Sequence, residues 1–227
     1  MANLLHDKKT RQRALIPTHP KDIDKSLPIL PSKGFIKAKY KNGVFNKLKY
    51  RLTAGGHRQK NGTYGRTSAP TIHIPNLLLQ ASLAKKNKLI MESVDIPGAY
   101  LHAPLRKEEQ VYIRIKKDLA DLMVDIDDSD LADALFLYLF PDGTLLLKVV
   151  MALYGMRQAG SLWHDLFAEV LLSIGMFRSL VDAAIFYRID GDRMQTANCM
   201  SMISSIYAIV QLGQLSSRRF SMRNSAT

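Results

Sequence analysis

Asp95 is the residue whose type and setting in this chain best suit metal chemistry. It follows Val94 at the end of an apolar run and opens the segment Ile96-Pro97-Gly98-Ala99-Tyr100. A carboxylate at a strand end can hold a hard cation, and a turn of small residues lets a triphosphate approach the backbone. The same segment is also typical of a solvated aspartate at the end of a strand, so the rest of the chain has to decide between the two.

The carboxylates of the sequence could form only half of a site for metal ions. No Asp or Glu follows Asp192, whereas a pair of metal ions needs carboxylates on both sides. The acidic segment Asp121–Ala134 is interpreted as a solvated face rather than a metal cluster, because no strand end is expected there.

The positive charge is concentrated at the start of the chain. Residues 1–60 hold 15 Lys and Arg against 3 Asp and Glu, a net +12, whereas residues 61–227 hold 17 of each. Such local basicity indicates either a segment that binds a polyanion or a solubilising tail.

Several classes of protein are disfavoured by the sequence. Cys199 is the only cysteine, so there is no disulfide framework and no cysteine zinc site. Residues 1–8 lack the apolar core of a signal peptide, and no run reaches the roughly 18 apolar residues of a membrane span. We therefore expect an intracellular protein without a membrane segment; the sequence leaves its oligomeric state open.

A β-hairpin is predicted over residues 33–55. Asn42-Gly43 is typical of a type I′ turn between arms at 35–41 and 44–54. Lys47, Lys49 and Arg51 fall on one face of the second arm, because alternate residues of a strand share a face.

The other elements alternate between helix and strand, which predicts an α+β fold or an α/β fold with a mixed sheet. Residues 1–32 are expected to be a poorly ordered basic lead-in, 33–192 to form the folded domain, and 193–227 to be an unpatterned tail. The helix expected over 71–88 should bury Leu77, Leu78, Leu79 and Leu83. The remaining expectations are a helix over 158–174, strands over 89–94, 111–115 and 183–189, and a hairpin over 135–150.

Four short runs of the sequence stand in a fixed order: KYRLTAGGHRQ from Lys49, VDIPGAY from Val94, LYGMRQAGSLW from Leu153 and SLVDAAIF from Ser179. In this order and spacing they resemble the reverse transcriptase of copia-type LTR retrotransposons. The resemblance runs from about Tyr40 to Arg193, roughly two thirds of the chain.

The resemblance implies a role for each matching residue. Lys49 and Arg51 look like the cations of the fingers that hold an incoming triphosphate. Asp95 looks like the first catalytic, metal-binding aspartate of the palm. Tyr100 looks like the steric gate, whose ring crowds a ribose 2′-hydroxyl and so favours deoxynucleotides.

Four further residues complete the expected site. Gly155 and Gln158 resemble the segment that packs beside the nucleotide and the template; their ordinary interpretations are a glycine before a helix and an exposed helical glutamine. Lys47 and Arg58 are expected to contact nucleic acid.

The implied fold is the fingers and partial palm of a right-hand polymerase, truncated before the second catalytic aspartate motif. In the intact family two Mg²⁺ ions assist RNA-directed DNA synthesis, and the partners are an RNA or DNA template-primer and deoxynucleotides. Here the expected Tyr-x-Asp-Asp strand is missing: residues 194–203 read MQTANCMSMI, and Gly160 replaces a usual proline. A frameshift or a mis-spliced gene would give such a tail.

The chain by itself is therefore expected to be inactive as a polymerase. Two alternatives remain: a non-catalytic nucleic-acid-binding remnant that uses the basic hairpin, and an unstable product without function, whose palm sheet has an unpaired edge.

Overall fold

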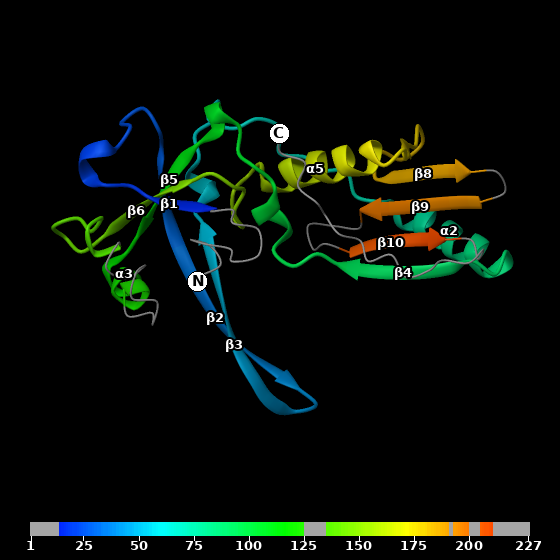
Figure 1. Cartoon of the computed structure of the whole chain (residues 1–227), viewed down its shortest axis with the longest axis horizontal. Coiled ribbons are helices and arrows are strands. Elements are labelled where there is room, and N and C mark those ends of the chain that lie inside the picture. Colours follow the sequence, from blue (N-terminus) through cyan, green and yellow to red (C-terminus); the bar gives the residue numbers. More distant parts are fainter. Residues whose placement is uncertain (1–13, 125–134, 191–192, 200–204, 211–227) are drawn as a thin grey trace. The chain divides into compact units, whose positions relative to one another are not determined.

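Two compact units make up the computed structural model, which describes residues 14–124, 135–190, 193–199 and 205–210. Unit 1 comprises residues 1–69 and 98–167, and unit 2 comprises residues 70–97 and 168–227. Each unit contains a five-stranded sheet together with helical segments (Figure 1). The single domain expected over 33–192 is thus divided into two units, each assembled from two separate stretches of sequence.

The sheet of unit 1 has the strand order β1-β6-β5-β2-β3. Only β2 and β5 pair in parallel; the other neighbours are antiparallel. The strands are β1 (Leu15–Pro17), β2 (Ile29–Lys41), β3 (Val44–Ala54), β5 (Val111–Ile115) and β6 (Leu145–Val149). The helical segments are η1 (Pro20–Asp22), η2 (Gly56–Arg58), η3 (Ala99–His102), η4 (Lys107–Glu109), α3 (Lys117–Val124) and the first part of α5 (Ala159–Ser173).

The start of the described chain belongs to the core of unit 1. Leu15 and Leu30 are each 1% exposed. Leu15 lies opposite Val149 in the β1–β6 pair, and Leu30 lies opposite Ile113 in the β2–β5 pair. The poorly ordered lead-in expected through residue 32 is therefore wrong for residues 14–32, while residues 1–13 lie outside the described part.

The predicted hairpin is confirmed as β2 and β3. Asn42 and Gly43 have φ values of 51° and 79°, which are the positive values that a type I′ turn requires. The hairpin extends beyond the rest of the unit 1 sheet (Figure 1). Its outer part is exposed on both faces, with Phe35 and Ile36 exposed at 55% and 69%.

The second predicted hairpin forms only in part. Its second arm is β6, whereas the first arm makes a single bridge between Leu139 and Leu145. Gly143 turns the chain at a φ of 74°, and its N–H donates to the carbonyl of Phe140.

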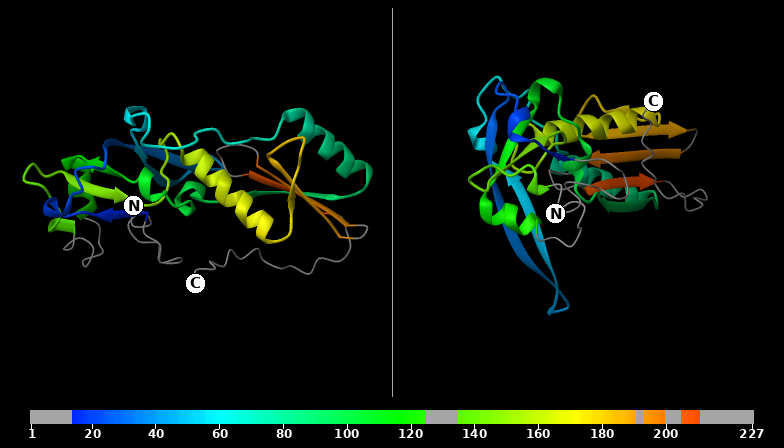
Figure 2. Two further views of the ribbon diagram at one scale, coloured as in Figure 1. Left: turned by 90° about the horizontal axis from the view of Figure 1, so that it is seen from above. Right: turned by 60° about the vertical axis from the view of Figure 1, so that its left-hand side comes forward.

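The sheet of unit 2 is antiparallel throughout, in the order β4-β10-β9-β8-β7. Its strands β8, β9 and β10, coloured orange to red, lie side by side in the right-hand view of Figure 2. Its strands are β4 (Ile90–Asp95), β7 (Phe177–Arg178), β8 (Ile185–Asp190), β9 (Arg193–Cys199) and β10 (Ser205–Val210), and its helices are α2 (Ile74–Lys86) and the second part of α5. Strands β9 and β10 lie where the sequence was expected to be unpatterned. The structure thus forms strands at residues 193–199 and 205–210 although their sequence shows no sustained period.

Both long helices form where the sequence predicts them, but α2 is rotated from the expected orientation. Leu78, Leu79 and Leu83 are exposed at 61%, 58% and 46%, whereas Ala84 is buried. In α5, Trp163 is buried and its ring centroid lies 6.2 Å from that of Phe167. Among the described residues, no helix has the length and apolar character needed to cross a membrane.

Asp182 fastens the start of α2 within unit 2. Its carboxylate is 6% exposed and accepts hydrogen bonds from the His73 N–H (3.1 Å), the Asn76 Nδ2 (2.8 Å) and the Ala184 N–H (3.0 Å). Burial raises the pKa of Asp182, but the hydrogen bonds to Asn76, His73 and Ala184 outweigh it, and the pKa is lowered.

Replacing Asp182 by Ala is expected to lower the free energy of unfolding by about 1–3 kcal/mol at pH 7, because buried donors lose a charged acceptor. A lowered pKa means that this stabilisation is present above the ordinary carboxyl pKa of about 3.9 and is lost as the pH falls through the folded-state pKa. Urea denaturation followed by circular dichroism at neutral and acidic pH measures the difference. Asp190→Ala, at an exposed position, is the control and should change stability by less than about 0.5 kcal/mol.

Candidate functional site

An aromatic and cationic cluster in unit 1 joins three separate segments of the sequence. The rings of Tyr100 and Tyr154 have centroids 4.9 Å apart and an interplanar angle of 53°. The guanidinium carbon of Arg51, on β3, lies 5.5 Å from the centroid of the Tyr154 ring. Tyr100 is 4% exposed, whereas Arg51 is exposed. Tyr154 therefore supports both residues that the sequence assigned to the triphosphate and the sugar.

Position 155 must be a glycine because its backbone lies against β3. Its φ is +90°, and a Cβ added there would lie 2.2 Å from the carbonyl oxygen of Ala54. The Ala54 N–H also donates to the carbonyl of Tyr154 at 2.8 Å. The close approach expected at Gly155 is thus made to the protein's own backbone, which accounts for the glycine without a ligand.

Gln158 is fully buried, so its ordinary interpretation as an exposed helical glutamine is wrong. Neither its Oε1 nor its Nε2 has a hydrogen-bond partner within the described part of the chain. Leaving a buried amide unpaired costs about 1–3 kcal/mol. Such a group is a candidate for binding a ligand or an ordered water.

Arg157, in the loop before α5, is hydrogen-bonded to the segment that follows β3. Its N–H donates to the Gln59 Oε1 and its Nε donates to the carbonyl of Gly56, both at 3.0 Å. Its guanidinium carbon lies 5.6 Å from the centroid of the Tyr64 ring. These contacts hold the segment after β3 against the loop that carries Tyr154 and Gln158.

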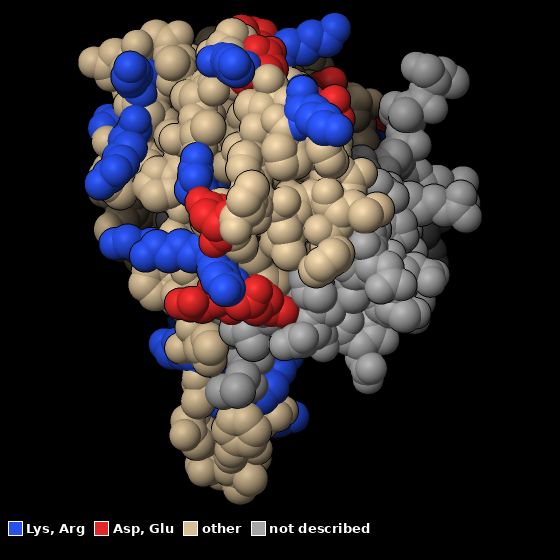
Figure 3. Space-filling view, turned by 90° about the vertical axis from the view of Figure 1, so that its left-hand side faces the viewer, with Lys and Arg blue, Asp and Glu red and all other residues tan. Residues whose placement is uncertain are grey.

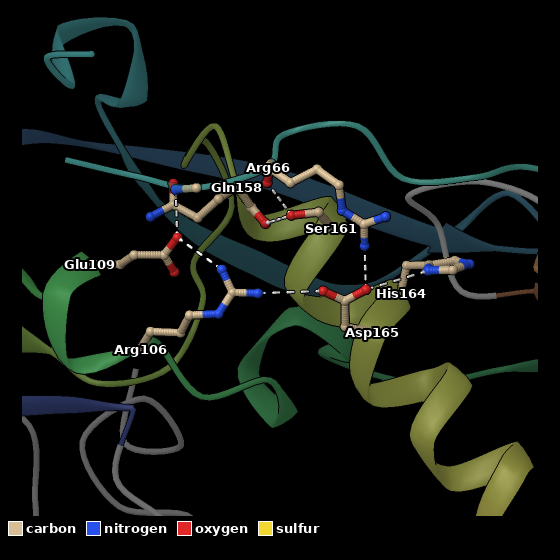
Figure 4. A network of polar contacts seen from close by, with 8 residues as sticks. Arg66, Arg106, Glu109, Gln158, Ser161, His164 and Asp165 are labelled. Carbon is tan, nitrogen blue, oxygen red and sulfur yellow. Dashed lines mark hydrogen bonds and ion pairs between the residues drawn. The ribbon is translucent and has the colours of Figure 1, made fainter. Parts of the chain in front are cut away.

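A polar network continues from this loop along α5 (Figure 4). Asp165 pairs with Arg66 and, at 3.6 Å, with Arg106. Arg106 also lies 3.6 Å from the carboxylate of Glu109, which is 2% exposed and accepts the Gly65 N–H at 2.6 Å. Ser161 Oγ donates to the carbonyls of Arg66 and Gln158.

Sequence reasoning missed this network. Arg66 and Asp165 are 99 positions apart, and no local spacing signals such a pair. Glu109 is followed by the predicted strand at 111–115, but nothing in its neighbours indicates that its carboxylate is buried.

The remaining predicted cations lie on or next to the hairpin. Lys47 is exposed on β3, and Arg58 is exposed at the end of η2. Register places Lys49 opposite Lys37, while the side chain of Lys49 lies outside the described part. In Figure 3 the hairpin, at the bottom of the view, carries Lys and Arg side chains and no Asp or Glu.

Asp95 belongs to unit 2, where it ends β4 and is exposed. The residue directly opposite it on β10 is Ser205. Across the described residues, no group of three or more His, Cys, Asp or Glu side chains is placed to hold a metal ion. A pair of Mg²⁺ ions needs several oxygen ligands with negative charge, and one carboxylate facing a neutral serine position does not fit that requirement. We therefore assign no metal-dependent step to this chain.

Comparison with known proteins relates the chain to transposon polyproteins. It is 26% identical over 153 residues to the retrovirus-related Pol polyproteins from transposons RE2 and RE1 of Arabidopsis thaliana. The matched region is 67% of this chain and 9% of each relative, so the chain spans a small part of their length. No protein-family model matches the chain. No solved structure matches it either.

Proposed function

Since the chain is similar to a region of retrotransposon Pol polyproteins, we propose that it is the reverse-transcriptase-like region of a copia-type element. The contact of Arg51 and Tyr100 with Tyr154 carries the proposal, because it joins two residues that the resemblance assigns to one nucleotide. In this proposal the ancestral substrates are deoxynucleotides and an RNA or DNA template-primer. The chain keeps part of the nucleotide site and the first catalytic aspartate, Asp95, but its sequence lacks the second catalytic aspartate motif.

The proposed nucleotide site assigns one task to each side chain. The exposed guanidinium of Arg51 offers planar donors that suit phosphate oxygens. Tyr100 limits the space beside the sugar, and Tyr154 holds the Tyr100 ring in place. The unpaired amide of Gln158 can both donate and accept a hydrogen bond.

Replacing Arg51 by Ala is expected to weaken binding of dATP by about 10-fold to 150-fold. A charge-assisted hydrogen bond contributes about 1.5–3 kcal/mol, and the variant removes the donors. Displacement of a fluorescent dATP analogue from the intact chain measures the effect.

Lys47→Ala is the matched control, because it removes one positive charge from the same strand nearer the turn. It should leave dATP affinity within about twofold, as expected for a distant exposed charge. Equal losses in both variants would mean that dATP responds to general charge rather than to a site at Arg51.

A second candidate function is binding of nucleic acid without chemistry, which the basic hairpin favours. Salt-dependent affinity for nucleic acid without nucleotide incorporation would identify it. The third hypothesis, an unstable product without function, is tested by measuring secondary structure with circular dichroism and aggregation with size exclusion. Strand β4 is an edge of the unit 2 sheet, so aggregation through that edge would support it.

A further inference from the structure

Register on the hairpin brings two rows of cations together. Lys39 lies opposite Lys47, Lys37 opposite Lys49, and Phe35 opposite Arg51. Residues directly opposite in an antiparallel pair share a face, as do alternate residues along one strand. We define the cationic hairpin face as these six positions together with Lys33, which lies two residues before Phe35. The sequence alone indicated only the row on the second arm.

This arrangement is unfavourable for the folded hairpin by itself. Like charges placed directly opposite each other destabilise a sheet. The sequence contains no Asp or Glu between Asp24 and Glu92, so the hairpin has no acidic side chain of its own. None of the ion pairs among the described residues includes Lys37, Lys39 or Lys47. A polyanionic partner would remove this repulsion.

Exposed aromatic rings identify the kind of polyanion. Phe35 is 55% exposed and shares the face with Lys37. Nearer the turn, Tyr40 and Phe45 are exposed at 65% and 54%, and their ring centroids lie 6.2 Å apart. The pairing register shifts between Lys39 and Tyr40, so these two rings are not counted in the cationic hairpin face. Cations interleaved with exposed rings suit a single strand, whose bases can stack on the rings while its phosphates meet the cations. The paired bases of a duplex are already stacked and cannot use the rings in this way.

We propose that the cationic hairpin face binds single-stranded nucleic acid along its length, independently of base sequence. From Lys33 to Lys39 the face spans about 20 Å at 3.3–3.4 Å per residue, which corresponds to about six stacked nucleotides at 3.4 Å each. This surface extends well beyond a single triphosphate at Arg51. The inference rests on the proposed function only for its choice of a nucleic acid as partner.

Fluorescence anisotropy of a labelled oligonucleotide of about a dozen nucleotides tests the proposal with the intact chain, at salt concentrations from about 50 to 200 mM. No nucleotide is added, so the result does not depend on whether the proposed site at Arg51 binds dATP. The double variant Lys37→Ala and Lys39→Ala should reduce the slope of log affinity against log salt by about 1.4, or 0.7 for each lost phosphate contact. Lys37→Arg with Lys39→Arg should retain the slope.

The matched control removes Lys85 and Lys86, two exposed lysines of α2, and should leave the slope unchanged. Phe35→Ala should weaken single-strand binding by about 5-fold to 150-fold, the loss of one stacked base, without changing the slope. The same variant should leave the weaker binding of a duplex of equal length unaffected.

An unchanged slope in the Lys37 and Lys39 double variant would overturn the proposal. Equal losses in that variant and in the α2 control would also overturn it, since net charge alone would then explain binding. Tighter binding of the duplex would contradict the choice of a single strand. Failure of dATP to bind in the separate Arg51 experiment would count against the proposed function and leave this surface supported.

Discussion

The purified chain is expected to leave a primer unextended on an RNA or DNA template, with either Mg²⁺ or Mn²⁺. Positioning of metal ions and stabilisation of charge supply most of the catalysis in phosphoryl transfer. Asp95 faces the position of Ser205 rather than a second carboxylate. We expect a rate below about a thousandth of that of an intact polymerase. Extension on a labelled primer, resolved by length, measures it.

Asp95→Asn is the control for this experiment and should give the same background as the unaltered chain. Robust extension that Asp95→Asn abolishes would show that another carboxylate completes the site. Asp182 does not serve in that role in the structure, because its oxygens accept hydrogen bonds from His73, Asn76 and Ala184.

Register also identifies the substitution that would supply a second carboxylate. Ser205→Asp would put it directly opposite Asp95, where paired Cβ atoms of neighbouring strands lie about 4.5–5.5 Å apart. We expect this variant to gain Mn²⁺ binding that Asp95→Asn removes, whereas Ser205→Asn should gain none. Titration followed by electron paramagnetic resonance reports the bound ion without any assay of activity.

Gly155→Ala is expected to lower the free energy of unfolding of unit 1 by about 2–5 kcal/mol. A left-handed backbone costs a residue with a Cβ about 1–2 kcal/mol, and forced overpacking adds about 1–3 kcal/mol. The clash is with backbone, since the new Cβ would lie 2.2 Å from the Ala54 carbonyl oxygen. Urea denaturation followed by the fluorescence of Trp163, the single tryptophan, measures the loss within the same unit.

Gly62 provides a closely matched control for Gly155. It has the same φ of +90° and belongs to the same unit, but nothing lies within 4 Å of an added Cβ. Gly62→Ala should therefore cost only the backbone strain of about 1–2 kcal/mol. Equal losses in the two variants would mean that the contact with β3 contributes nothing to stability.

Elements specified by local sequence could be predicted. Asn42-Gly43 specifies the turn of the hairpin through its positive φ values, and Gly175, at a φ of 83°, follows the end of α5. Such signals depend on a few neighbouring residues, which a sequence displays directly.

Elements formed by distant partners could not be predicted in the same way. The pairing of Leu30 with Ile113 depends on a parallel strand more than 80 positions away. Strand β10 is a short, mostly apolar run in which apolar and polar residues do not alternate. The periodicity of such a run does not distinguish a strand from a buried helix. Its place beside β4 follows from pairing across the sheet, so the residue opposite Asp95 became known only from register.

The candidate site likewise contains residues that the sequence identified and contacts that it did not. The sequence, through its resemblance, selected Arg51 and Tyr100, but it gave no sign that Tyr154 joins them. It left Gln158 as either a ligand-binding or an exposed residue, and the structure buries it, which contradicts only the exposed alternative. The network of Arg66, Arg106 and Asp165 depends on contacts between distant segments and has no local pattern.

Photocross-linking of azido-dATP to the intact chain, followed by peptide mapping, tests most directly whether the cluster of Arg51, Tyr100 and Tyr154 binds a nucleotide. We predict adducts in the peptides that carry Tyr100 or Tyr154, reduced by excess unlabelled dATP and by Arg51→Ala. Lys47→Ala should leave the same adducts in place. Adducts confined to other peptides, or labelling that unlabelled dATP does not reduce, would contradict a nucleotide site in unit 1.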